Sequence, residues 1–282
     1  MQITAALTEE RVKKPVPPNA DVSNIAERCY SCSMLKSFNR CPQIGLRTYI
    51  QNLKPKGDSI KMLFGTVIHE ALACMAKGGM FADAIDICQL YLPTTHPLPM
   101  FTISGAEGIL TKYVKQWKSS PYKVRDVEVE FHVDMGEGRF FSGRIDQIVE
   151  HNDRIYVLDH KTTASVGANF MSSYDPPELQ MDGYCYACGV LVGKCDGAII
   201  DGISTAANPK QRFLRITPRR CTDLFPTVFT QSARHIEKCV LEGVFEQRTN
   251  ACHYYGGCAF QDLCVYGDNP SIVEMKYEQR TQ

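Results

Sequence analysis

The sequence predicts a mixed α/β fold, in which a central sheet is flanked by helices. Between residues 124 and 133, apolar side chains alternate with polar ones, and a turn and two further strand-like segments follow up to residue 159. Before and after this region, apolar residues recur at the three- and four-residue intervals of helices. Hydrophobic residues make up 44% of the 282-residue chain, enough for a substantial core, and no internal repeat or composition break divides it.

The first part of the chain is expected to be helical after a loose start. Residues 1–24 are rich in Pro, Lys and Asn and lack periodicity, so they predict a loose segment. A helix is expected over 33–53, interrupted near Pro42 because proline cannot continue the hydrogen-bond ladder. Further helical patterns cover 62–75, 81–91 and 106–117.

Strands are expected next. Val124–Val133, Phe140–Glu150 and Arg154–Asp159 predict a three-strand meander, with a turn at 136–138. The later pattern predicts a helix from the Pro176-Pro177 pair to Val192, strands over 197–203 and 213–216, and a helix over 223–245. We therefore expect a single domain over 25–282, divided into a helical part, a core, and a C-terminal helix with a cysteine cluster, over residues 33–118, 122–217 and 222–264.

Composition narrows the class of protein. Lys plus Arg and Asp plus Glu both number 31, so charge neither supports nor excludes nucleic-acid binding. The sequence has no apolar run of membrane-spanning length and no signal-peptide pattern, so a cytoplasmic protein without membrane contact is expected. The 13 cysteines are odd in number, and in a reducing compartment they favour metal binding over a disulfide framework.

Two carboxylates and a lysine converge where the predicted strands end. Asp146 lies on the second strand, and Asp159 and Lys161 share one face at the end of the third, because side chains alternate with period two. Mg²⁺ prefers carboxylate oxygens, so both aspartates are candidate ligands that would hold it against a phosphate. Lys161 would then orient water, lower its pKa or neutralise transition-state charge. The alternative interpretation is a strand end that carries charges to meet solvent.

Other polar residues accompany these motifs. His69 lies on an apolar-patterned helix in "FGTVIHEAL", where a lone histidine is usually structural. Gln180 and Tyr184 in "QMDGY" are four residues apart and project from one helix face, where they could bond phosphate or form an ordinary polar surface.

In their order along the chain, these motifs resemble the RecB-like nucleases of the PD-(D/E)xK superfamily. The resemblance implies a restriction-endonuclease-like core and a DNA nuclease, an exonuclease rather than an endonuclease. It implies Mn²⁺ or Mg²⁺ held by His69, Asp146, Asp159 and the backbone carbonyl of His160. Lys161 would serve catalysis, with Gln180 and Tyr184 contributing to the active site. Glu130 is a further candidate acid, although it also fits the polar face of a strand.

The cysteines predict a second metal site. Five residues separate Cys252 from Cys258 and Cys258 from Cys264, and thiolates favour zinc or iron-sulfur clusters, with Cys41 as the preferred fourth ligand. The chain is similar to the iron-sulfur subgroup of RecB-like nucleases, which includes AddB-type and CRISPR adaptation nucleases. That resemblance implies a 4Fe-4S cluster joining the two ends of the chain. Zinc remains an alternative, as does a separate site at Cys29, Cys32 and Cys41.

The predicted partner is a DNA single strand or duplex end. A basic stretch could meet phosphates, or could protect an edge strand from aggregation, through Lys210, Arg212, Arg215, Arg219 and Arg220. No base-reading module or P-loop is evident, so any helicase motor would be a separate partner protein. Such a nuclease would suit DNA repair, recombination or phage DNA processing in a prokaryotic cell or a phage-infected host. The alternative function is a noncatalytic DNA-binding or assembly subunit that retains the nuclease fold.

Overall fold

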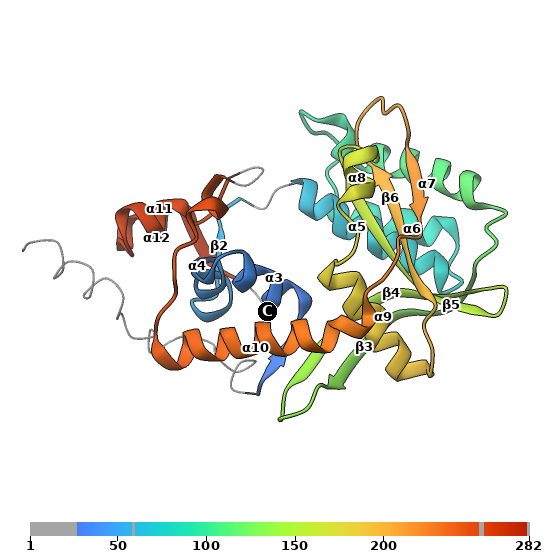
Figure 1. Ribbon diagram of the computed structural model, residues 1–282. Coiled ribbons are helices and arrows are strands. Elements are labelled where there is room, and N and C mark those ends of the chain that lie inside the picture. The colour runs from blue at the N-terminus through green and yellow to red at the C-terminus, as the bar shows by residue number, and fades with distance from the viewer. Residues whose placement is uncertain (1–26, 58–59, 254–256, 281–282) are drawn as a thin grey trace, which may run out of the picture. The chain divides into compact units, whose positions relative to one another are not determined.

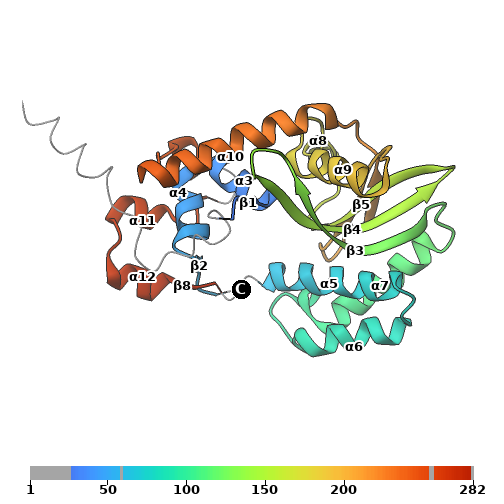
Figure 2. The same ribbon diagram turned by 90° about the horizontal axis from the view of Figure 1, so that it is seen from below.

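A mixed β-sheet with helices on its faces organises the chain (Figure 1, Figure 2). The computed structural model describes residues 27–57, 60–253 and 257–280. These residues fall into two compact units. Unit 1 takes the residues up to 57, 132–142 and those from 226 onward, and unit 2 takes 58–131 and 143–225. The predicted loose segment 1–24 lies outside the described residues, and the expectation of a single domain stays a prediction.

The sheet confirms the predicted meander and adds to it. Among the described residues its strand order is β1-β4-β5-β6-β7, with β3 also paired to β4. Antiparallel pairs join β4 to β5 and β6 to β7, whereas β5 and β6 run parallel. The strands are β1 (Cys29–Tyr30), β3 (Lys123–Asp134), β4 (Phe140–His151), β5 (Arg154–Thr163), β6 (Gly197–Ser204) and β7 (Phe213–Ile216).

One strand boundary was predicted wrongly. β5 was expected to end at Asp159, but it continues to Thr163. Its parallel ladder with β6 pairs Lys161 with Gly202 and Thr163 with Ser204, and these pairs prolong the strand into a polar sequence. Asp159 and Lys161 therefore lie within a strand between two neighbours.

The helices of unit 2 cover both faces of its strands (Figure 2). One face carries α5 (Ile60–Ala76), α6 (Phe81–Tyr91) and α7 (Ile103–Trp117), and the other carries α8 (Ala168–Ser172) and α9 (Leu179–Val192). The first group encloses an apolar core, since α5, α6 and α7 bury side chains such as Phe64, Ile68, Cys88 and Leu110 against one another. These helices were predicted within a few residues, except that α8 was not foreseen.

Local sequence signals explain where the helices begin and end. The Thr102 hydroxyl accepts a hydrogen bond from Gly105 N at 3.2 Å and caps α7. The Glu178 carboxylate caps α9 by accepting from Met181 N at 2.8 Å. The predicted start of this helix at the proline pair was two residues early. The helix ends at Gly193, whose φ of +83° suits glycine.

Unit 1 combines the two ends of the described chain. Its helices are α3 (Cys32–Arg40), α4 (Pro42–Gly45), α10 (Phe225–Glu242, whose first residue belongs to unit 2), α11 (Gln261–Tyr266) and α12 (Pro270–Lys276), and a π-helical turn covers Leu46–Ile50. Two short strands, β2 (Leu53–Pro55) and β8 (Tyr277–Gln279), pair antiparallel. Short 3-10 turns complete the two units at Pro99–Phe101, Thr222–Leu224 and Thr249–His253.

A polar cluster holds α10 of unit 1. Glu237 accepts hydrogen bonds from Arg28 Nε at 3.0 Å and Tyr30 OH at 2.9 Å, and it receives a two-point contact from the Arg139 guanidinium at 2.8 and 2.9 Å. Tyr30 also packs edge-on against Phe229 with ring centroids 5.9 Å apart. One helix thus fixes β1 and the start of β4. None of the described helices has the length and apolar character needed to cross a membrane.

Candidate active site

The candidate site is centred on β5. Asp159 is almost fully buried, with 2% of its side chain exposed, and Lys161 Nζ lies 2.6 Å from Asp159 Oδ2. Both side chains are on the same face of the strand, as the two-residue period requires. A buried carboxylate is therefore paired with a lysine, which satisfies the need of a buried charge for a partner.

Asp146 joins this pair from β4. Its Oδ2 accepts a hydrogen bond from the main-chain N–H of His160 at 2.9 Å and lies 3.3 Å from His69 Nδ1. His69 is on α5, where Gly65 lies one turn earlier. A Cβ on Gly65 would sit 2.8 Å from Thr162 Oγ1, so the glycine lets α5 approach β5 closely.

Two side chains of α9 complete the cluster, as their four-residue spacing predicted. Gln180 Nε2 lies 3.4 Å from Asp159 Oδ1 and 3.3 Å from Tyr184 OH, and its Oε1 accepts from Lys161 Nζ at 3.4 Å. Gln180 therefore contacts both members of the Asp159–Lys161 pair. Tyr184 also packs edge-on against Phe131 at 5.8 Å between ring centroids.

The electrostatics of the two carboxylates differ. Burial by itself raises the pKa of Asp146, but the hydrogen bond and charge of His69, with the charge and N–H of His160, outweigh it and lower this pKa to about 2. Burial raises the pKa of Asp159, and the nearby Asp146 charge raises it further against the opposing Lys161. For Lys161, burial lowers the pKa, but the Asp159 charge and hydrogen bond outweigh it and raise the pKa. The surroundings of the two aspartates thus shift their pKa values in opposite directions.

The donor chemistry fits a hard divalent cation, because carboxylate oxygens and an imidazole nitrogen are ligands that Mg²⁺ or Mn²⁺ takes. Within 27–57, 60–253 and 257–280, however, no group of three or more His, Cys, Asp or Glu side chains is already arranged to hold a metal ion. The His160 side chain points away from Asp159 and is engaged elsewhere, as expected from the pleat. Glu130 is exposed on β3.

The four predicted cluster cysteines all belong to unit 1. Burial raises the pKa of the Cys264 thiol, Arg47 opposes this, and the charges of Cys258, Cys41 and Cys252 raise it further. Cys264 is therefore within electrostatic reach of the other three, although Cys41 is far from it in sequence. All four are free thiols. The Sγ of Cys29, a candidate ligand of the alternative separate site, lies 2.9 Å from Ser142 Oγ.

A buried network behind β5 was missed by sequence reasoning. Asp201 on β6 is fully buried and lies 3.3 Å from His160 Nδ1 and 2.9 Å from Arg215 Nη2, and it also accepts a hydrogen bond from Tyr113 OH. The opposite ring nitrogen, His160 Nε2, lies 3.1 Å from Gln147 Nε2. The available signal was one aspartate within the apolar run "GAIIDGIS".

This network corrects the predicted basic surface. Arg215 was expected to face solvent, but its side chain is only 13% exposed and pairs with Asp201. Arg220 is also buried, with Nη1 3.5 Å from Asp182 Oδ1. Arg212 donates to the main-chain carbonyls of residues 204, 206 and 207. The alternating residues of a short strand such as β7 supply one inward face, so not every basic residue there reaches solvent.

A family profile and one solved structure agree with this architecture. The profile of the PD-(D/E)XK nuclease superfamily matches residues 30–265. A solved structure from Eubacterium rectale, described as a candidate exonuclease, shares 14% identity and a TM-score of 0.51, covering 86% of this chain and 92% of its own. A second, of SSO0001, has 16% identity and a TM-score of 0.33 over 73% of this chain and 84% of its own. No curated protein matches the chain. The extent of the superfamily match establishes that the chain belongs to the PD-(D/E)XK nuclease superfamily.

Proposed function

We propose that this chain is a divalent-metal-dependent DNA nuclease of the RecB-like group, acting as an exonuclease. The observation that carries the proposal is the convergence of Asp146, Asp159 and Lys161 on adjacent strands, with His69 and Gln180 in contact with them. The solved candidate exonuclease has a related fold and supports the choice of exonuclease.

Each side chain has a defined task in this proposal. His69, Asp146, Asp159 and the His160 carbonyl would hold Mg²⁺ or Mn²⁺, which would supply Lewis-acid stabilisation of the phosphate and activation of water. Lys161 stays protonated beside Asp159, orients the attacking water and offsets negative charge on the phosphate. Gln180 contacts both Lys161 and Asp159 and holds their side chains in place, and Tyr184 contributes a hydroxyl beside Gln180.

The test is cleavage of end-labelled single- and double-stranded DNA with Mg²⁺, with Mn²⁺ and with EDTA. Wild type is expected to cut only with metal, and Asp159→Asn and Lys161→Met are expected to lose at least ~100-fold, since electrostatic groups of this kind contribute on that order. The matched controls are Asp126→Asn and Lys123→Met, which alter exposed β3 residues. Cleavage that persists in the site variants rejects the assignment.

The same experiment decides between the proposed enzyme and the alternative, a noncatalytic DNA-binding or assembly subunit. Folded wild type that binds DNA but releases no labelled product with either metal supports the alternative and makes partner proteins, such as a helicase, the next subject. Progressive shortening of the labelled DNA strand from one end identifies an exonuclease and its polarity. Internal cuts in circular DNA identify an endonuclease.

We also propose that Cys41, Cys252, Cys258 and Cys264 bind a 4Fe-4S cluster. The support is the electrostatic proximity of Cys264 to the other three thiols and the soft character of thiolate ligands. Anaerobically purified protein should contain iron and sulfide and absorb visible light. Cys264→Ser should lose both properties, whereas Cys221→Ser, in unit 2, should retain them. Zinc without iron in the purified protein would instead support a zinc site at these four cysteines.

A further inference from the structure

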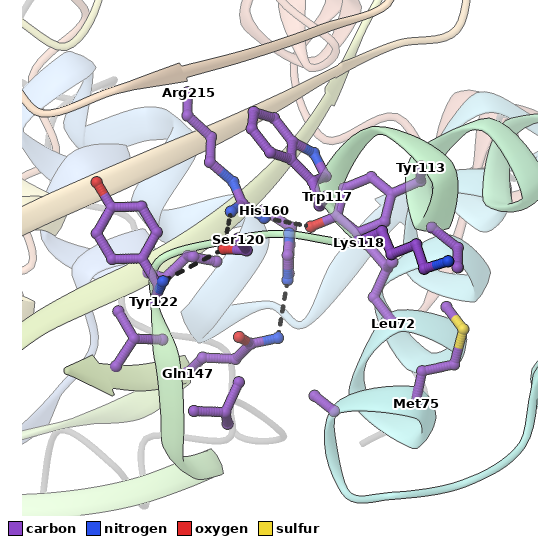
Figure 3. A pocket seen from close by; sticks show the side chains of 15 residues that line it. Leu72, Met75, Tyr113, Trp117, Lys118, Ser120, Tyr122, Gln147, His160 and Arg215 are labelled. Carbon is purple, nitrogen blue, oxygen red and sulfur yellow. Dashed lines mark hydrogen bonds between the residues drawn. The ribbon is translucent and has the colours of Figure 1, made fainter. Parts of the chain in front are cut away.

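A cavity of about 260 Å³ lies inside unit 2, behind the catalytic face of β5 (Figure 3). Its wall comes from α5, α7 and the strands β3, β4, β5 and β7. The side chains that decide its chemistry are Trp117, Tyr122, Gln147, His160 and Arg215. The nuclease mechanism above uses none of these side chains.

The cavity presents a cation between aromatic rings. The Arg215 guanidinium carbon lies 3.9 Å from the Trp117 ring centroid and 5.9 Å from that of Tyr122. Arg215 is held in place because it donates to Asp201 at 2.9 Å and to Ser120 at 3.0 Å. The rings and the guanidinium are therefore preorganised, which lowers the cost of ordering them around a ligand.

Two N–H donors of this wall lack a partner. Trp117 Nε1 and Arg215 Nε are buried, and among the residues that the structure describes neither has a hydrogen-bond acceptor. An unsatisfied buried donor costs about 1–3 kcal/mol. The cavity is far larger than the roughly 30 Å³ that one water occupies, so a single water would leave most of it empty. Both N–H groups are enclosed by protein and have no surface open to the cavity, so the groups available to a ligand are the aromatic rings, the guanidinium and the amide that line it.

On the other side, Gln147 offers an amide. Its nitrogen lies 3.1 Å from His160 Nε2, and its oxygen is turned away from that ring (Figure 3). The volume is just under the ~300 Å³ lower limit of pockets for drug-sized ligands, which restricts the occupant to about one substituted ring system. Lys118 adds an ammonium group at an exposed position on the wall.

We propose that this cavity binds a single nucleotide, with its base against Trp117 and Tyr122 and its phosphate near Lys118. Nucleobases have flat faces that stack on aromatic and guanidinium groups, and their ring nitrogens and carbonyls accept hydrogen bonds. A sugar phosphate without a base could bind the basic side chains but would make no stacking contact with the Trp117 and Tyr122 rings.

The cavity and the candidate active site share one residue. The His160 ring lines the cavity, whereas its main-chain N–H donates to Asp146 at 2.9 Å. The His160 ring also lies 5.9 Å from the ring of His69, centroid to centroid. The inference deepens the proposed nuclease function, on which its biological meaning rests, because it names a nucleotide of the DNA strand or a released mononucleotide as the ligand.

The chain contains one tryptophan, and this residue lines the cavity, so its fluorescence reports on occupancy. The full chain is titrated in EDTA, which prevents metal-dependent cleavage, with dAMP, dTMP, deoxyribose 5-phosphate and inorganic phosphate. Saturable quenching by the mononucleotides and no saturable change with the other two is expected. No saturable change with either mononucleotide, or equal responses to deoxyribose 5-phosphate, overturns the proposal.

Variants locate the binding. Tyr122→Leu should weaken mononucleotide binding at least ~10-fold through loss of stacking, whereas Tyr122→Phe should retain it. Lys118→Ala changes an exposed residue and should weaken dAMP binding but not deoxyadenosine binding. Unchanged dAMP affinity in both Tyr122→Leu and Lys118→Ala also overturns the proposal. Nucleotide binding without DNA cleavage would uphold this site and reject the nuclease proposal, and cleavage without nucleotide binding would do the reverse.

Discussion

Removing the negative charge of Asp201 should destabilise unit 2 strongly. Asp201→Asn preserves the shape of the side chain but leaves the Arg215 guanidinium without its carboxylate, in a position where only 13% of that side chain is exposed. Breaking a buried pair from one side costs about 3–5 kcal/mol. Arg215 keeps hydrogen bonds to Tyr113 OH at 2.9 Å and Ser120 at 3.0 Å, so we expect the lower end, about 3 kcal/mol.

Thermal unfolding at pH 7, followed by circular dichroism, measures this loss. With roughly 2–4 °C per kcal/mol for chains of about this size, the midpoint should fall by about 6–12 °C. Asp126→Asn, on an exposed position, should move it by less than about 2 °C. The double variant Asp201→Asn, Arg215→Gln should lose less stability than the two single variants added together, because it leaves neither partner as an unpaired buried charge. A decrease of less than about 2 °C in the midpoint of Asp201→Asn, or strict additivity of the two single variants, would refute the reasoning.

Three further predictions concern the site and its supports. Asp146 has a pKa of about 2 in the folded protein, against an ordinary 3.8. It should therefore add about 2 kcal/mol to the free energy of unfolding above pH ~4, and this stabilisation should be lost as the pH falls toward 2. In Asp146→Asn, the thermal unfolding midpoint should therefore depend less on pH between about 2 and 4 than in wild type. An unchanged dependence on pH would contradict the lowered pKa of Asp146. Gly202→Ala should cost about 1–3 kcal/mol, because its Cβ would sit 2.6 Å from Phe170 Cζ, whereas Gly189→Ala, which meets nothing within 4 Å, should not lower the midpoint. Chelation of iron should lower the unfolding midpoint of wild type but not that of Cys264→Ser, as expected when a metal site links distant segments. Equal midpoints before and after iron removal in wild type would count against a structural cluster.

The sequence was most informative where one periodicity governed a whole element. Alternation located β3 and β4, and the helical period located α5, α6 and α7, whose apolar faces pack into one core. The close contacts of Gln180 and Tyr184 followed from their four-residue spacing. The assigned roles of the site residues remain predictions.

What local pattern could not supply was pairing across long sequence distances. The end of β5 depends on its ladder with β6, and the short strands β2 and β8 exist only through each other. Asp201 stands in an apolar run, and its role emerges only when Arg215 and Tyr113 meet it from other elements. For the same reason the sequence could not show that Arg215 turns inward.

The segmented make-up of unit 1 has a consequence for its synthesis on the ribosome. Arg28 and its partner Glu237 are 209 residues apart. At about 5–20 residues per second, the first segment emerges roughly 10–40 s before α10 can cover it. Over that interval the apolar face of α3, with Leu35 and Phe38, lacks the partners that later bury it. Unit 2, formed from residues 58–131 and 143–225, is complete in sequence before unit 1 can close. Nascent chains halted before α10 should therefore be the form most prone to chaperone capture and aggregation.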